Sequence, residues 1–165
     1  MFSIYIWPMQ VDIFRAVPFL KDLTDAELQA FSELLEARAV QAGQSILIEG
    51  NPVDSLYIVA NGSVHVRRRA LKREVLLGRV GAGGFFGEIN LFDPGVATAS
   101  VIAVGNIQLG VVSHQALKAF MSENPRAGYS ITSCLLGEVS RRLRQTNQRL
   151  VNAVYWATAP DSAKS

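Results

Sequence analysis

The stretch GGFFGEINLFDPGVATASV, residues 83–101, holds the residue types that could bind an anion. Its glycines would let backbone N–H groups approach a phosphate closely, because glycine has no side chain to hold a ligand away. Glu88 follows Gly87 and could accept hydrogen bonds from vicinal or ribose hydroxyls. No Lys or Arg lies between Arg79 and Lys118. The residues leave two interpretations open: an anion site without a cation, or a glycine-rich turn at a β-barrel corner.

The chain shows no constellation typical of an enzyme, a metal site or a cofactor site. Its two histidines, His65 and His114, have no neighbouring His or Cys at ligand spacing. We interpret His65 as a residue on one face of a strand and His114 as a surface residue at a helix start. The single cysteine, Cys134, cannot form an internal disulfide, which favours the cytoplasm. We therefore expect a protein that is not an enzyme.

Composition favours one compact domain. The 165 residues are 49% hydrophobic and 18% charged, with a formal charge of +2, which argues against disorder and against a wholly basic surface. The basic run VRRRALKRE is typical of a solvated hairpin tip, with nucleic acid as the alternative. The apolar start MFSIYIWPMQV is broken by Pro8 and soon meets Asp12, so we expect a packing arm and no membrane span.

Periodicity divides the chain into four parts. Residues 1–37 are predicted to form an arm and a helix, in which Thr24 and Glu27 have the spacing of a capping box. Short alternating runs over 38–113 predict a β-barrel. Helical periodicity returns over 114–157, with a short helix ended by Pro125 and a long one from about Ala127 to about Trp156. Residues 158–165 are predicted to be a frayed tail.

The long helix carries a heptad seam near its end. A seam of this length can pack on its own domain or pair with a second copy, and we expect a homodimer. The positions alternate by three and four residues: Leu136, Val139, Leu143, Thr146, Leu150 and Ala153.

Several motifs together carry a family resemblance. In order they are FRAVPFLKDLTDAEL, VQAGQSILIEGNPVDSLYIVANGSVHV, GGFFGEINLF and RRLRQTNQRL. They resemble the cyclic-nucleotide-binding domain of the catabolite activator protein family and of the regulatory subunits of cyclic-AMP-dependent kinase. The resemblance implies a mainly β fold, a jelly-roll barrel with flanking helices and a C-terminal dimerisation helix. Nothing after that helix matches a helix-turn-helix, so DNA binding is not expected.

The resemblance also implies a phosphate-binding cassette. Glu88 matches the family's ribose 2′-hydroxyl acceptor, and Ala97 stands where the family has the arginine that pairs with the cyclic phosphate. Thr146 and Asn147 match the pair that contacts adenine. Val53 departs from a glycine common in the family. The residues that the resemblance places at the ligand are Phe86, Gly87, Glu88, Ala97, Thr98, Ala99, Arg142, Thr146 and Asn147.

These features predict a ligand-sensing regulatory module that binds cyclic AMP or cyclic GMP weakly, or a related ligand, and signals through an effector protein. A dimeric scaffold with an empty pocket is the alternative. A truncated transcription regulator is the third hypothesis.

Overall fold

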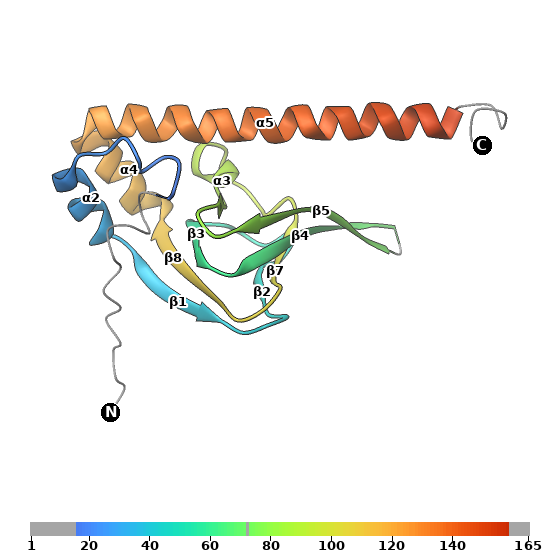
Figure 1. The fold of residues 1–165 in the computed structure, drawn as a ribbon, viewed down its shortest axis with the longest axis horizontal. Helices are drawn as coiled ribbons and strands as arrows, with labels where there is room; N and C mark the ends of the chain where they lie inside the picture. Colours follow the sequence, from blue (N-terminus) through green and yellow to red (C-terminus); the bar gives the residue numbers. More distant parts are fainter. Residues whose placement is uncertain (1–15, 72, 159–165) are drawn as a thin grey trace.

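A computed structural model describes residues 16–71 and 73–158 (Figure 1). The predicted N-terminal arm and the frayed tail fall mostly outside these residues. The described part consists of β-strands packed beside helices, with one long helix running along one side (Figure 1). None of its helices is long and apolar enough to cross a membrane.

The strands form two antiparallel four-stranded sheets. In spatial order the first contains β1 (Glu36–Val40), β8 (Ile107–Ser113), β3 (Ser55–Asn61) and β6 (Phe85–Phe86). The second contains β2 (Ser45–Leu47), β7 (Ser100–Ala103), β4 (Ser63–Ala70) and β5 (Arg73–Gly81). The prediction of a mainly β jelly-roll with flanking helices is confirmed.

The predicted capping box starts the first described helix, α2 (Asp25–Ser32). The backbone N–H of Thr24 donates to Glu27 Oε2 at 2.8 Å, and the Glu27 N–H donates to Thr24 Oγ1 at 3.3 Å. Arg126 pairs with the same Glu27 carboxylate. These contacts hold the start of α2 against the long C-terminal helix.

Two apolar clusters form the core. One lies between the first sheet and the helices, where the rings of Phe19 and Phe85 meet edge to face at 5.1 Å. The other fills the space between the sheets, where Tyr57 stacks on Phe86 with ring centroids 5.0 Å apart. The consecutive residues Phe85 and Phe86 therefore point into different clusters, as neighbouring residues of a strand do.

Pro125 separates the two C-terminal helices. Helix α4 (His114–Glu123) stops before it, and α5 (Pro125–Thr158) starts on it. Proline suits this position because its missing N–H would have no helical partner in the first turn. The prediction of a short helix that ends at Pro125 and is followed by a long one is confirmed, and the long helix starts on Pro125 itself rather than at about Ala127.

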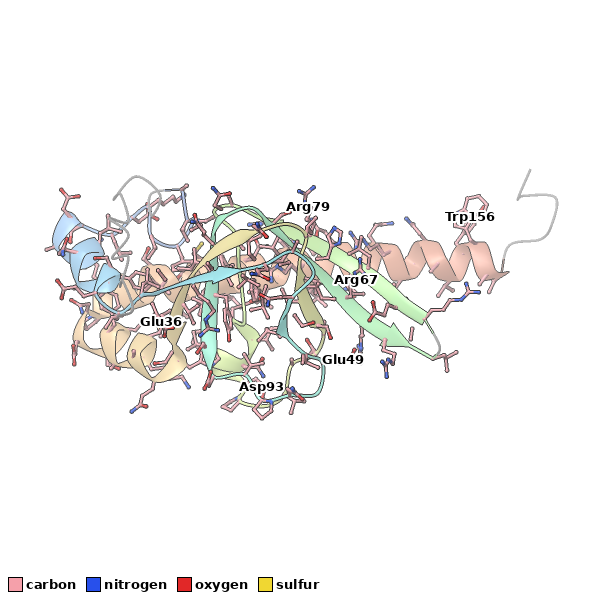
Figure 2. The ribbon with its side chains drawn as sticks, turned by 90° about the horizontal axis from the view of Figure 1, so that it is seen from below. Glu36, Glu49, Arg67, Arg79, Asp93 and Trp156 are labelled. Atoms are coloured by element: carbon pink, nitrogen blue, oxygen red, sulfur yellow. The ribbon has the colours of Figure 1, made fainter. Side chains whose placement is uncertain are left out.

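Helix α5 has a buried beginning and an exposed end. Ile131 and Leu135 are fully covered, whereas Leu143 is 59% exposed. The last turns, which carry Trp156, extend past the two sheets (Figures 1 and 2). The short helix α3 (Ile89–Phe92) lies beneath the middle of α5 (Figure 1).

Candidate ligand-binding site

The turn between β6 and α3 requires glycine at position 87. Gly87 has a φ of +87°, and a Cβ added there would lie 2.5 Å from the carbonyl oxygen of Ser55. Only glycine tolerates both the conformation and the close approach. The Gly87 carbonyl lies 2.9 Å from Nε2 of His114, and since a carbonyl only accepts, Nε2 carries the proton.

His114 is buried, which corrects the interpretation of it as a surface residue. Its side chain lies at the start of α4, it is 8% exposed, and its backbone N–H donates to Asp54 O at 2.7 Å. Burial lowers the pKa of His114, and nearby Lys118 acts in the same direction, against the Gly87 carbonyl and Asp54. No local pattern in the sequence indicates this contact, because its two residues belong to separate elements.

Glu88 is not a free acceptor. It is 3% exposed, and its Oε1 lies 2.6 Å from Nη1 of Arg142 on α5. Burial raises the pKa of Glu88, and the Arg142 charge offsets this only in part. A ribose hydroxyl would therefore have to share this carboxylate with the guanidinium.

Arg142 ties the cassette to α5 by more than one bond. Nη2 donates to the carbonyl of Phe85 at 2.9 Å, and Nε donates to Glu138 Oε1 at 2.9 Å. The guanidinium also lies over the Phe85 ring, 5.6 Å from its centroid. The structure thus brings the predicted residues Glu88 and Arg142 together and adds Glu138, which the sequence analysis did not identify.

At the other end of the cassette, Ala97 is held by backbone bonds, and the Asn90 side chain donates from Nδ2 to the Val96 carbonyl at 3.3 Å. The Ala97 N–H donates to Asn51 O at 2.8 Å, and the Ala97 carbonyl accepts from the Gly50 N–H at 2.9 Å. The methyl group of Ala97 is buried, as is that of Ala99, whereas Thr98 is exposed. The Ala97 N–H is therefore already used and does not face an anion.

Two of the glycines at the start of the motif are turn residues. Gly83 has a φ of +80°, and its N–H donates to Val59 O at 2.9 Å. The Gly84 N–H donates to Gly81 O at 2.9 Å. Of the two interpretations left open, the barrel-corner turn describes these two residues.

Comparison with known proteins decides the family. The protein-family model described as Cyclic nucleotide-binding domain matches residues 37–124. The chain belongs to the cyclic nucleotide-binding domain family.

Among its relatives, the CRP-like cAMP-activated global transcriptional regulator of Mycobacterium tuberculosis is 30% identical over 145 residues, which are 87% of this chain and 63% of that protein. The N-terminal domain of a transcriptional regulator from Streptomyces coelicolor superimposes with a TM-score of 0.69 at 30% identity, covering 84% of this chain and 95% of that one. The Catabolite Activator Protein of Thermus thermophilus gives 0.73 at 27% identity, covering 84% and 63%. The chain thus spans less than two thirds of the Mycobacterium and Thermus proteins.

One face of α5 contacts both the cassette and strand β5. Arg142 reaches Glu88, and Arg149, seven residues on, donates to the carbonyl of Leu77 in β5. Thr146 lies between them on the same face, since residues four and seven apart are neighbours on a helix. Its hydroxyl donates to the Arg142 carbonyl at 2.9 Å. Thr146 is therefore placed between the cassette and β5.

Asn147 lies on a different face of the helix. It is exposed and is four residues after Leu143 and three before Leu150, whose side chains are 59% and 61% exposed. Of the predicted adenine-contacting pair, only Thr146 faces the site of its own chain. Asn147 would contact a ligand only if that ligand were bound to a second copy of the chain.

Within residues 16–71 and 73–158 no group of three metal-ligating side chains converges. Arg79, the cation nearest in sequence before the motif, donates from Nη2 to Ser63 Oγ at 2.9 Å. It pairs with His65 across β4 and β5, on the face opposite the buried Val64. The side chains brought together here are therefore the Glu88 carboxylate, the Arg142 guanidinium that is bound to it, and the Thr146 hydroxyl.

Proposed function

We propose that the chain is a non-enzymatic regulatory module, located in the cytoplasm, which binds a cyclic nucleotide weakly or a related ligand and signals through an effector protein. The observation that carries this is the bond between Glu88 of the cassette and Arg142 of α5. A ligand that hydrogen-bonds to Glu88 competes directly with a residue of the helix. Occupancy is thereby coupled to the position of α5.

Weak binding of a cyclic nucleotide follows from Ala97. A charge-assisted hydrogen bond to a phosphate contributes about 1.5–3 kcal/mol, or one to two decades of affinity. A buried methyl group supplies none of this. The same observation supports a second candidate function, a dimeric scaffold whose pocket stays empty.

Calorimetric titration with cyclic AMP and cyclic GMP separates these two functions. We expect weak binding, with cyclic AMP preferred because the Thr146 hydroxyl faces the base side of the site. Absence of heat with both nucleotides, together with an unchanged unfolding temperature, would favour the scaffold.

We further propose a homodimer through α5. Leu136, Leu143 and Leu150 are 64%, 59% and 61% exposed and recur every seven residues along one side of the helix. An apolar stripe of this kind is typical of a coiled-coil interface. The pairing would also bring Asn147 towards the ligand of the second copy.

Sedimentation of wild type and Leu143→Arg tests the pairing. We expect a dimer at micromolar concentration that Leu143→Arg dissociates, because the substitution places a charge in the centre of the stripe. Ser133→Arg, an exposed helix position before the stripe, serves as the matched control and should remain dimeric. A monomeric wild type would exclude the interface.

A further inference from the structure

The end of the molecule opposite α2 is basic. Residues 63–81, which form β4 and β5, and residues 139–158 of α5 together hold ten of the chain's 16 lysines and arginines, but only one of its 14 acids, Glu74. The two segments meet where Arg149 donates to the Leu77 carbonyl. The β4–β5 hairpin and the last turns of α5 project towards the same end of the molecule (Figures 1 and 2). These two segments are called the basic end below.

Several cations of the basic end have no acid beside them. Arg67 and Arg68 pair with acids at 3.3 Å and 3.4 Å. Among the residues that the structure describes, no carboxylate lies within ion-pair distance of Arg69, Arg73 or Arg144, and all three are exposed. The basic end therefore carries a positive charge that faces solvent, and such a charge attracts an extended anionic surface.

Apolar side chains are interleaved with the arginines of the hairpin. Across the two strands, Val75 pairs with Arg68 and Leu76 pairs with Arg67. The valine and the leucine are 45% and 54% exposed. Arginine can keep its charge in water or in a headgroup layer while its stem and its neighbours lie in an apolar one. The hairpin thus presents charge and apolar surface to the same partner.

The tip of the hairpin carries an outward leucine. Leu71 is 98% exposed, so packing within the chain does not explain it. Its φ is +55°, in the left-handed region that glycine and asparagine usually occupy. Residues held in such conformations are concentrated at functional sites. An apolar side chain held outwards at a basic tip is suited to insertion into a lipid layer.

Aromatic side chains lie at the end of α5. Tyr155 and Trp156 are 58% and 55% exposed, and their rings meet edge to face at 5.5 Å. Trp156 follows Arg149 by seven residues, which places both on one face of the helix. Tryptophan and tyrosine are enriched where a membrane meets water, because each has an apolar body and a polar group.

We propose that the basic end binds an anionic lipid surface. Phospholipid headgroups would supply the negative charges for Arg69, Arg73 and Arg144, and the acyl layer would cover Leu71 and Trp156. A nucleic acid would match the charges but would leave the aliphatic side chains of the hairpin uncovered. The inference goes beyond the proposed function and does not depend on the ligand of the cassette.

Flotation of the full chain with phosphatidylcholine vesicles, with and without phosphatidylserine, tests the inference. We expect binding only when phosphatidylserine is present, and weaker binding as salt is added. Arg69→Gln combined with Arg73→Gln should weaken it about twenty-five-fold, since each arginine near an anionic surface contributes about five-fold. Lys21→Gln combined with Lys118→Gln removes the same charge before α2 and on α4, and should change binding little. Failure to bind phosphatidylserine vesicles, or equal binding to both kinds of vesicle, would overturn the inference.

Leu71→Asn separates insertion from a structural role. Asparagine suits left-handed backbone, so the unfolding temperature should not fall. Vesicle binding should weaken about ten-fold, because the leucine side chain no longer leaves water on insertion. Unchanged vesicle binding would contradict the inference. Dissociation of a dimer by Leu71→Asn would assign the tip to a second copy of the chain instead.

The fluorescence of Trp156 reports whether the end of α5 enters the lipid. The chain has two tryptophans, so Trp7→Phe leaves Trp156 as the only one. Phosphatidylserine vesicles should shift its emission to shorter wavelength, and unshifted emission from floated protein would contradict insertion. Duplex DNA and single-stranded RNA serve as competitors. An oligonucleotide that binds more tightly than the vesicles would assign the basic end to nucleic acid and overturn the inference.

Discussion

The two ends of the cassette are built differently. At one end, side chains from the helices anchor the turn: His114 of α4 binds Gly87, and Arg142 of α5 binds Glu88. At the other end, Ala97 is fixed only by backbone hydrogen bonds to residues 50 and 51. The first end is coupled to the helices and carries charge. The second is coupled to the barrel and carries none in its side chains from Val96 to Ala99.

The two ends therefore suit two different tasks, which are coupling of ligand occupancy to the helices and recognition of the charge on the ligand. An end that is bonded to α4 and α5 can transmit occupancy to those helices, whatever the ligand is. An end without a cation determines which ligands are accepted, because an anion finds no counter-charge there. The proposed coupling to α5 and the proposed weak binding of a phosphate therefore depend on different ends of the cassette.

Removing the guanidinium from the anchored end should have the largest effect. Arg142→Gln leaves the buried Glu88 carboxylate without its counter-ion, and we expect a loss of roughly 2–3 kcal/mol in the free energy of unfolding near neutral pH. Urea denaturation measures this. Arg141→Gln is the control, since the Arg141 side chain is 60% exposed and pairs with Glu138 at the surface, and it should cost less than about 0.5 kcal/mol.

The cost of Arg142→Gln should shrink in mild acid. Burial raises the pKa of Glu88 above its ordinary value of 4.5. A carboxyl with a raised pKa favours the fold when it is protonated, and this contribution is lost as pH rises through the folded pKa. A loss of stability that stays constant between neutral pH and pH 5 would show that Arg142 acts by packing rather than by charge.

Adding a guanidinium to the other end should strengthen the binding of a cyclic nucleotide. Ala97→Arg places a cation where the family has its phosphate-binding arginine, and we expect cyclic AMP to bind about ten- to a hundred-fold more tightly. Calorimetric titration measures the gain, and circular dichroism verifies the fold. Val96→Arg adds the same charge at a position that is 51% exposed and should give little improvement. Equal gains from both variants would reduce the effect to general electrostatics.

The sequence predicted what depends on neighbouring residues. The capping box at Thr24 and Glu27 was confirmed because its contacts span one helical turn. The end of the short helix at Pro125 was confirmed, but the start of the long helix was predicted two residues late, because the sequence does not say that the same proline also opens the next helix. The period of seven in α5 indicated the exposed stripe.

Contacts between distant elements could not be predicted. Glu88 and Arg142 are 54 residues apart, and the resemblance placed each near a ligand rather than against the other. His114 was misassigned because its burial depends on the Gly87 turn, which belongs to another element. Gly83 and Gly84 suggested an anion site, but their N–H groups are used by Val59 and Gly81. Such pairings become visible only when the sheets and helices are placed together.

The smallest expected effect tests the His114 anchor through pH. Burial lowers the pKa of His114 below its ordinary value of 6.5, so folding disfavours the protonated form. A histidine with a lowered pKa contributes stability that is present above pH 6.5 and is lost as pH falls from there through the folded pKa. We expect the free energy of unfolding to decrease over this range, by about 1.4 kcal/mol for each unit by which folding lowers the pKa of His114. His114→Gln keeps a side-chain donor for the Gly87 carbonyl but does not titrate, so this part of the pH dependence should disappear. His65→Gln, on the outer face of β4, should retain it.

The difference between wild type and His114→Gln isolates the histidine from Glu88, whose raised pKa produces a slope of opposite sign. If the two proteins lose stability in parallel below pH 6.5, then protonation of His114 does not loosen the Gly87 turn.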